Sequence, residues 1–415
     1  MNAIAATDED TRPFAWYRTL SPRGRRAFAG AFGGYGLDSY DYWVLPFSIG
    51  AIIAYFHIST GTGGLLGTVT LVVSAIGGAG AGILADRIGR VRTLQLTVAT
   101  YTLFTVLCGF APNFETLLVL RGLQGLGFGG EWAAGAILIA EYAKPKFRGR
   151  TVAFVQSSWA VGWGLLVFVQ TIVFTAAPDD IAWRILFWTG VIPALLVLWV
   201  RRNVQDADEA TERRERSASK GSFTAIFKGD LLRTTLFAAL LSTGVQGGYY
   251  TLATWLPTYL KKTRELTVIN STGYYAVLIA GAFIGYVCGG YLTDLLGRKK
   301  NIWIFAVLSA VLIFAYTQVP HGANGLILVL SFPLGFSMSA IFAGFGSFLA
   351  ELYPTEVRGT GQGFTYNFGR AIGAIFPTVV GFYGVGGALV LGAVGYGIAA
   401  LALFGLPETR GRALT

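Results

Sequence analysis

Long apolar segments follow one another along almost the whole chain, and they limit what it can fold into. A helix that crosses a bilayer needs about 20 predominantly apolar residues. This length gives twelve candidate spans, at residues 28–56, 63–85, 93–111, 115–140, 150–176, 183–200, 232–258, 270–293, 301–319, 323–350, 359–382 and 385–405. Charged residues make up only 13% of the chain, well below the roughly 25% of a soluble domain. We therefore predict an all-α membrane protein with twelve transmembrane helices.

The chain divides into two related halves. The longest polar interruption, residues 201–230, leaves six spans on each side, which predicts bundles at 1–202 and 230–415 and a cytoplasmic linker at 203–229. GILADRIGRVR (82–92) recurs as GYLTDLLGRKK (290–300), and AEYAKPKFRGR (140–150) recurs as AELYPTEVRGT (350–360). The offsets are 208 and 210 residues. A duplicated membrane bundle is typical of transporters that work by alternating access.

The distribution of basic residues predicts the orientation. Of the 32 lysines and arginines, 26 fall in the N-terminal segment, the C-terminal segment or the loops on the same side. Because cytoplasmic loops are enriched in these residues, we expect both termini and the linker to be cytoplasmic, in a bacterial plasma membrane. The first apolar run is too long for a signal-peptide core, so it is expected to remain as a span. The net charge of +10 therefore does not require a nucleic-acid partner.

Several motifs carry a family resemblance. The loop after the second span reads Gly-x-Leu-x-Asp-Arg-x-Gly-Arg, and its second copy has Leu295 in place of Arg87. This loop resembles the signature of the major facilitator superfamily, as do RGLQGLGFGGEW (121–132) in the fourth span and LPETRGR (406–412) at the chain end. The resemblance covers the whole chain and implies two six-helix bundles. It also implies that spans 1, 4, 7 and 10 line a central cavity.

Three further segments resemble one part of that superfamily. LDSYDYW (37–43), GGEWAAG (129–135) and YNFGRAIGAIFP (366–377) are similar to the organic-acid and proton symporters, in particular the sialate and lactate group. This resemblance implies import of a small organic monocarboxylate together with a proton. Symport of aromatic acids or sialic acid is the alternative within the group.

Three acidic residues fall near the middle of the spans and are candidates for proton coupling: Asp38, Asp41 and Glu131. A charge at this depth costs about 2.5–3.5 kcal/mol on insertion scales, so it is a functional candidate by default. Asp41 has a structural alternative, because it can pair with Arg121. Both histidines fall at external span ends, which leaves the proton to the carboxylates.

Arg370 is the main candidate for binding the substrate carboxylate. A guanidinium matches a carboxylate with two parallel hydrogen bonds and stays charged when buried. The C-terminal half offers no acid near the middle of a span, so a substrate anion is expected to complete this site. The alternative is a structural contact with a carbonyl or with an acid of the other half. Further expected substrate-binding residues are Asn367, Arg121, Tyr35, Tyr42, Trp132, Gln246, Tyr249 and Tyr250.

Charged residues in the repeated loops form a predicted conformational latch. The family picture places Asp86 near the start of span 11 and Asp294 near the start of span 5, where helix N-termini favour negative charge. A solvated cytoplasmic cluster is the alternative. The latch residues are Asp86, Arg87, Arg90, Glu141, Arg148, Arg150, Asp294, Arg298, Glu351 and Arg358.

Other function classes lack their sequence signatures. The chain has no Walker-type phosphate loop, no Cys/His metal cluster and no evident nucleophile–base set, so we expect neither ATP-driven transport, a cofactor, a metal nor an enzyme. Its two cysteines lie in apolar stretches, which argues against a disulfide framework. We expect a monomer in the lipid bilayer. A proton-driven drug exporter and a non-transporting nutrient sensor remain as less favoured alternatives.

Overall fold

The computed structural model describes residues 15–142, 148–192, 199, 223–354 and 356–410, and all regular structure within them is helical. The side chains of residues 82, 83, 85, 86, 90, 130–141, 148, 149 and 223 lie outside this description. The longer helices are α2 (Pro22–Tyr55), α3 (Thr60–Ile88), α4 (Arg90–Cys108), α5 (Phe114–Tyr142), α6 (Arg148–Ala176), α7 (Asp179–Trp188), α10 (Asp230–Thr258), α11 (Val268–Leu296), α12 (Arg298–Gln318), α13 (Asn324–Glu351), α14 (Arg358–Gly373), α15 (Ile375–Tyr383) and α17 (Leu391–Ala402). Two single turns, α1 (Ala15–Arg18) and α16 (Val385–Ala388), accompany them.

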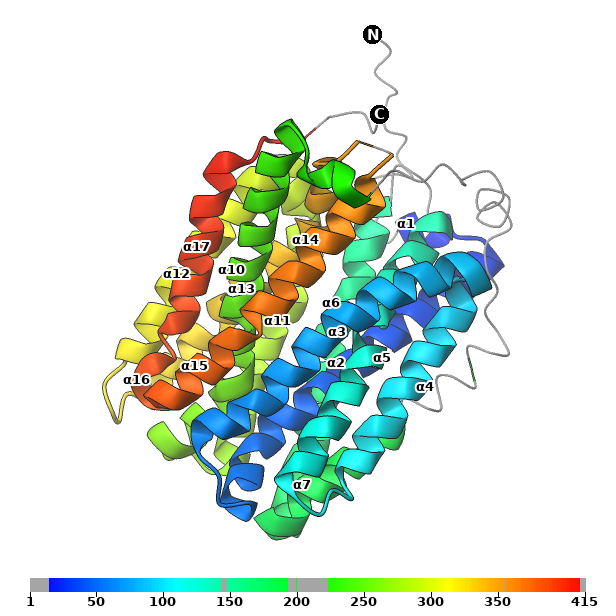
Figure 1. The fold of residues 1–415 in the computed structure, drawn as a ribbon. Helices are drawn as coiled ribbons and strands as arrows, with labels where there is room; N and C mark the ends of the chain where they lie inside the picture. The colour runs from blue at the N-terminus through cyan, green and yellow to red at the C-terminus, as the bar shows by residue number, and fades with distance from the viewer. Residues whose placement is uncertain (1–14, 143–147, 193–198, 200–222, 355, 411–415) are drawn as a thin grey trace.

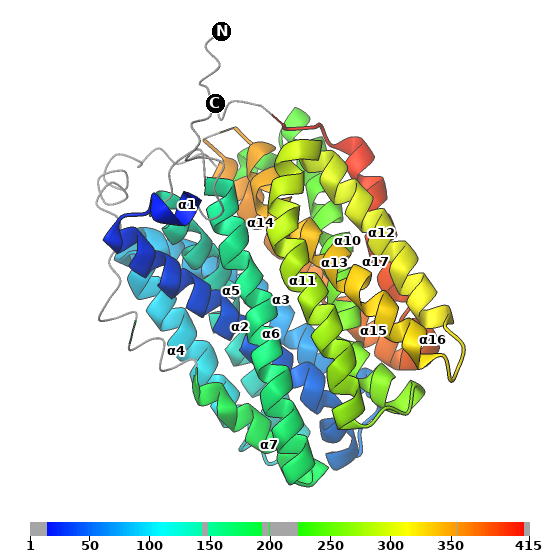
Figure 2. The ribbon, with the colours of Figure 1, turned by 180° about the vertical axis from the view of Figure 1, so that it is seen from behind.

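The helices form two bundles that lie side by side, α2–α7 and α10–α17 (Figure 1). They meet where α6 packs on α11, where α3 packs on α14 and α15, and where α2 packs on α10. The view from behind shows α6 and α11 adjacent along their length (Figure 2). We call the end that holds α1 the upper end and the end that holds α7 and α16 the lower end, as in Figure 1.

Close helix crossings repeat between the bundles at the offsets found in the sequence. In the first bundle, a β carbon added at Gly77 of α3 would overlap the carbonyl oxygen of Leu126 in α5. In the second bundle, one added at Gly285 of α11 would overlap the carbonyl oxygen of Phe336 in α13. The two glycines are 208 residues apart and the two carbonyl residues 210 apart. Only glycine permits this close approach of two membrane helices. The two bundles therefore share the packing of their helices as well as the sequence motifs of their loops.

Seven described helical segments are long and apolar enough to cross a membrane: Thr60–Ala81, Val91–Cys108, Arg150–Ala176, Val268–Leu296, Arg298–Gln318, Asn324–Glu351 and Val385–Gly405. Among the helices below this threshold, α2 and α10 carry buried polar side chains such as Asp41 and Gln246. Of the predicted sixth span, the structure describes residues 183–192 and 199, and these are helical. Two of the helices outside this set thus hold several candidate site residues.

The predicted span at 359–382 is not one continuous helix. It consists of α14 and α15, which are separated at Ala374. Thr68 of α3 donates a hydrogen bond to the Ala374 carbonyl at 2.5 Å and lies 2.6 Å from the Thr378 hydroxyl. These bonds join α3 of the first bundle to the break between α14 and α15 in the second. Arg370 lies in the last turn of α14, where the helix dipole favours a positive charge.

Contacts between the bundles close the lower end of the interface. Lys261 forms an ion pair with Asp179 at 2.9 Å. Nearer the middle, the hydroxyls of Thr171 in α6 and Thr272 in α11 are 2.8 Å apart. These bonds join side chains that would separate if the bundles parted at this end.

Arg264 fixes the connection after α10 to the end of α12. Its guanidinium donates to the carbonyls of Val319 at 2.6 Å and Pro320 at 3.0 Å, and to the Tyr259 hydroxyl at 2.9 Å. Arg264→Gln is therefore expected to lower the free energy of unfolding by about 2–3 kcal/mol, since buried bonds from a charged group are lost. Thermal melting of the purified protein measures this, with Lys262→Gln at an exposed position as control. Equal melting of the two variants would contradict the assignment.

Candidate functional site

A buried chain of hydrogen bonds joins three helices of the first bundle around Asp41. The side chains of Thr105 in α4 and Gln124 in α5 both donate to the Asp41 carboxylate, one to each oxygen. The Gln124 carbonyl oxygen accepts from Arg121, one turn earlier in α5. The sequence suggested a direct pairing of Asp41 with Arg121. In the structure, Gln124 lies between them and connects the two charges.

Arg121 is almost fully buried, and Gln124 supplies its hydrogen-bond acceptor among the described residues. Its Nε atom has no acceptor in this part of the chain. A cavity of about 10 Å³ lies beside it, lined among others by Asp41, Tyr42, Gln124 and, from the second bundle, Thr254. A buried guanidinium with spare donors next to a cavity between the bundles can bind an anion there once the bundles part, because about 10 Å³ has room for about one water.

Arg370 lies in α14 with 4% of its surface exposed, and it faces the first bundle. Its Nη2 donates to the Tyr366 hydroxyl at 3.3 Å, and its Nη1 is 3.5 Å from the Ser74 hydroxyl of α3. The guanidinium also lies over the rings of Tyr366, at 5.0 Å, and Phe128, at 5.5 Å. Among the described residues, the guanidinium thus donates hydrogen bonds to hydroxyls and lies over aromatic rings, and its Nε has no acceptor.

Asp38 lies one turn before Asp41 in α2 and is buried. It interacts electrostatically with Arg370, across the interface between the bundles. Tyr250 interacts with both of these charged groups. Two pairs, each of one acidic and one basic side chain, therefore lie at or beside the interface. Asp41 is linked to Arg121 within one bundle, and Asp38 and Arg370 interact electrostatically from opposite bundles.

Tyrosines and one glutamine of α10 fill the space between these charges. Gln246 donates to the Tyr366 carbonyl of α14 at 2.9 Å and accepts from the Tyr250 hydroxyl at 3.3 Å. The Tyr249 hydroxyl accepts from the indole of Trp159 in α6 at 2.6 Å, so this bond also crosses the interface.

Rings of the first bundle cover the same space. Tyr42 packs on Tyr250 at 5.9 Å and on Phe128 at 5.9 Å, and Tyr35 packs on Trp159 at 5.2 Å. Asn367 donates to the Gly363 carbonyl of its own helix, and its side chain lies against Gly78 of α3. The structure therefore brings the described candidates to the bundle interface, with Asn367 at its α3–α14 contact. Glu131 and Trp132 belong to α5, but their side chains lie outside the described part of the chain.

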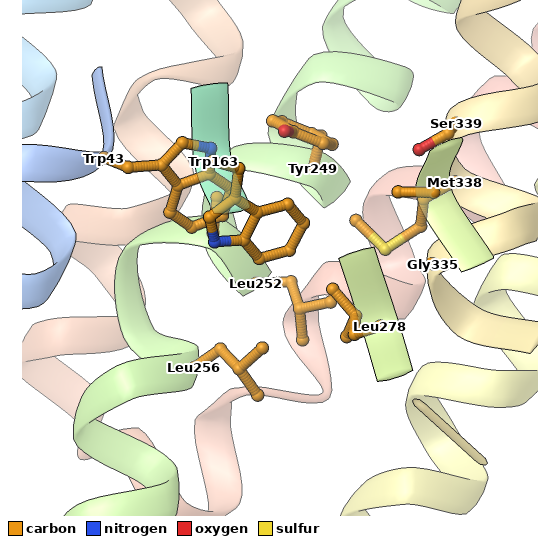
Figure 3. Close-up of a pocket in the computed structure, with 11 residues that line it drawn as sticks. Trp43, Trp163, Tyr249, Leu252, Leu256, Leu278, Gly335, Met338 and Ser339 are labelled. Atoms are coloured by element: carbon orange, nitrogen blue, oxygen red, sulfur yellow. The ribbon is translucent and has the colours of Figure 1, made fainter. Parts of the chain in front are cut away.

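A second cavity at the interface is lined by Tyr249 and by further residues that the sequence did not single out. Trp43 of α2 and Trp163 of α6 stack face to face, with ring centroids 3.9 Å apart and an interplanar angle of 6°. Opposite them lie Tyr249, Leu252 and Met338 of the second bundle (Figure 3). In the sequence, the two tryptophans are single aromatic residues in two separate spans, so they do not indicate a pair. The pair becomes visible only when α2 packs against α6.

Part of the predicted latch forms a network at the upper end of the second bundle. Arg298 is 3.1 Å from Asp294 and 3.3 Å from Glu351. Thr409 donates to the same Glu351 oxygen at 2.5 Å. The described ion-pair partner of Asp294 is thus Arg298, within its own bundle.

Arg150, one of the predicted latch residues, makes a contact across the interface, because its guanidinium lies 4.9 Å from the Tyr291 ring centroid. Arg358 lies 3.4 Å from the Tyr353 carbonyl, and Arg87 is exposed. The side chains of Asp86, Arg90, Glu141 and Arg148 lie outside the described residues.

Glu408 ties the chain end to the second bundle. Burial alone would raise the pKa of this carboxyl, but the backbone N–H groups of Arg410, Lys299, Thr409 and Lys300 outweigh burial and lower the pKa. Its Oε1 accepts from the N–H of Arg298 at 3.0 Å, at the first residue of α12. A carboxylate at a helix N-terminus is favourable because the dipole presents positive charge there.

Comparison with known proteins places this arrangement in a family. The profile of the Major Facilitator Superfamily matches residues 31–378. A "probable 4-methylmuconolactone transporter" of Cupriavidus pinatubonensis is 40% identical over 97% of this chain and 94% of its own length. The cis,cis-muconate transport protein of Acinetobacter baylyi is 31% identical over 90% and 91%. The inward-open xylose transporter XylE from E. coli superposes with a TM-score of 0.75 at 20% identity, covering 93% of this chain and 97% of that one.

Proposed function

The chain belongs to the major facilitator superfamily, and on this premise we propose that it imports a small organic anion together with a proton by alternating access. The observation that carries the proposal is the burial of Arg121 and Arg370 at the bundle interface, each with a guanidinium nitrogen that no described acceptor fills. A buried cation with spare donors is stabilised by an anion that enters from outside the fold. A carboxylate substrate has the charge and the geometry for this role.

The named relatives support an organic acid as substrate. The muconolactone and muconate transporters match almost the whole chain, and the sialic acid transporter NanX of Escherichia coli is 28% identical over 94% of it. We propose a carboxylate of this general size. A monocarboxylate remains our first choice, with aromatic or sialic acids as alternatives. Relatives named inner membrane transport proteins in Escherichia coli support a bacterial inner membrane, and we propose that the upper end faces the cytoplasm.

Proton coupling is assigned to the buried aspartates, Asp38 and Asp41, with Glu131 as a third candidate. Asp38 interacts electrostatically with Arg370 across the interface, so a proton on this carboxyl changes the net charge that the proposed substrate-binding guanidinium experiences. Protonation at that place can accompany substrate binding, and release of the proton can accompany substrate release. Arg370 is the proposed main contact of the substrate carboxylate, and Arg121 the second.

A thermal-shift screen of the purified protein tests the substrate class. Carboxylic acids should raise the melting temperature by binding to the folded state, while their neutral amides and lipophilic cations should not. Stabilisation by lipophilic cations, and not by acids, would favour the drug-exporter alternative and overturn the proposal.

Alternating access predicts that the lower end must open during the cycle. With Cys108 and Cys288 replaced by serine, cross-linking the pair Thr171→Cys and Thr272→Cys should reduce uptake to that of liposomes without protein. The reason is that a covalent bond across α6 and α11 prevents the two bundles from separating there. Reducing a disulfide-containing linker should restore uptake, and each single cysteine variant serves as control. Full uptake by the cross-linked protein would contradict alternating access at this interface.

A further inference from the structure

Two stacked tryptophans form one wall of a cavity between the bundles. The rings of Trp43 and Trp163 are nearly parallel and come from α2 and α6 of the first bundle. The opposite wall comes from the second bundle and includes Leu252, Leu278 and Met338 (Figure 3). Because the two walls belong to different bundles, this cavity must change shape whenever the bundles move relative to each other.

The indole N–H groups of both tryptophans lack a hydrogen-bond acceptor. Both side chains are more than nine-tenths buried, and neither Nε1 atom has a partner among the described residues. Buried donors are nearly always paired, so two orphan donors in one stacked pair at a cavity require an explanation. A ligand that carries an acceptor oxygen would supply the missing partner.

This cavity adjoins the anion-binding one. Tyr42 lines the cavity beside Arg121, and its ring stands edge-on to Trp43 with centroids 5.5 Å apart. On α10, Ala253 lines the tryptophan cavity and the next residue, Thr254, lines the cavity beside Arg121. One elongated ligand can therefore reach both places once the bundles separate.

We propose that the Trp43–Trp163 pair is a subsite for a flat, unsaturated body of the substrate that carries a carbonyl oxygen, such as the ring of an unsaturated lactone acid. This inference rests on the proposed function, which supplies the carboxylate bound at the arginines. Stacking on an indole face selects planar bodies, and the sulfur of Met338 adds a polarizable contact. The indole N–H groups lie in the ring planes, so they select a carbonyl oxygen that projects past the edge of the pair, and not one held over an indole face. In the closed form the cavity holds about 10 Å³, which is room for about one water, so the ring enters when the bundles part.

Three acids of similar size test separately whether the subsite prefers a flat body and whether it prefers a carbonyl oxygen. Coumalate is a flat lactone acid with a carbonyl, benzoate is flat without one, and cyclohexanecarboxylate is not flat. Dissociation constants measured by calorimetry on the purified full chain should rank coumalate tightest, then benzoate, then cyclohexanecarboxylate, with about three- to tenfold between successive acids.

Two substitutions assign the preference to the tryptophans. Trp43→Phe and Trp163→Phe keep a ring but remove the N–H, so they should weaken coumalate to the level of benzoate and leave benzoate within about twofold. Trp183→Phe is the matched control, because Trp183 is also buried with an orphan indole N–H but lies in α7 and lines neither cavity. It should leave the ranking unchanged.

The outcomes separate this inference from the proposed function. If all three acids bind with equal affinity, or if the tryptophan variants keep the full preference for coumalate, the subsite is wrong while import of an organic anion stands. If none of these or other carboxylates binds, the proposed function itself fails. A variant that does not fold is replaced by Trp43→His or Trp163→His, which keeps a smaller planar ring with an N–H and should reduce the preference for coumalate over benzoate to part of its wild-type size, whereas an undiminished preference would overturn the subsite.

Discussion

Arg370→Ala is expected to weaken the binding of a carboxylate substrate by about ten- to hundredfold, because one charge-assisted contact of roughly 1.5–3 kcal/mol is lost. Arg370→Lys should also weaken binding, since lysine keeps the charge but loses the planar fork. Equilibrium binding of a substrate acid and of its neutral amide measures the effect. The wild-type protein should prefer the acid strongly, and Arg370→Ala should not.

The control for Arg370 is Arg233→Ala. Arg233 also lies near a ring, 5.9 Å from the Phe237 centroid, but it is exposed near the start of α10. This variant should bind the acid as the wild type does. If Arg370→Ala still prefers the acid over the amide as strongly as wild type, Arg370 is structural, and Arg121 becomes the anion site.

Asp38→Asn is expected to abolish accumulation driven by a proton gradient while it preserves exchange of substrate across the membrane. The neutral amide removes the proposed proton carrier, which interacts electrostatically with Arg370, but keeps the size of the side chain. Counterflow in proteoliposomes, which needs no net proton movement, should therefore persist. We expect gradient-driven uptake to fall by about tenfold or more, to the level seen without a gradient. Glu131→Gln is predicted to lower gradient-driven uptake and preserve counterflow in the same way.

Asp230→Asn, at an exposed position at the start of α10, is the matched control and should leave both activities intact. Asp41→Asn should behave differently from Asp38→Asn. Asp41 accepts hydrogen bonds from Thr105 and Gln124, so its loss disturbs the packing of α2, α4 and α5. If Asp38→Asn and Glu131→Gln both retain wild-type coupling, the proton carrier is elsewhere, with Asp41 as the next candidate.

The architecture could be predicted because it depends on patterns that are local in sequence. Apolar length sets the position of each membrane helix, and two matched offsets of 208 and 210 residues revealed the second bundle as a copy of the first. The crossings of Gly77 over Leu126 and of Gly285 over Phe336 confirm the repeat in three dimensions. The break at Ala374 was missed although the sequence contains a local cause, because Pro377 has no N–H to bond the Gly373 carbonyl four residues earlier.

The candidate site could be predicted only where a residue is unusual in a membrane. A charge such as Asp38 or Arg370 stands out in an apolar segment, so the sequence identifies it. Gln124 and Trp43 are not unusual there. The role of Gln124 as a connection between Asp41 and Arg121, and that of Trp43 as a partner of Trp163, depend on how α2 packs against α5 and α6. Neighbours that come from different helices are not visible in the order of residues.

Uptake of an organic acid into proteoliposomes, with and without an inward proton gradient at fixed sodium, tests the central claim most directly. Liposomes without protein are subtracted, because the neutral form of a weak acid crosses the bilayer unaided. We predict accumulation that requires the gradient and is abolished by a protonophore. Equal protein-dependent uptake in the presence and absence of the gradient would contradict proton-coupled import by this chain.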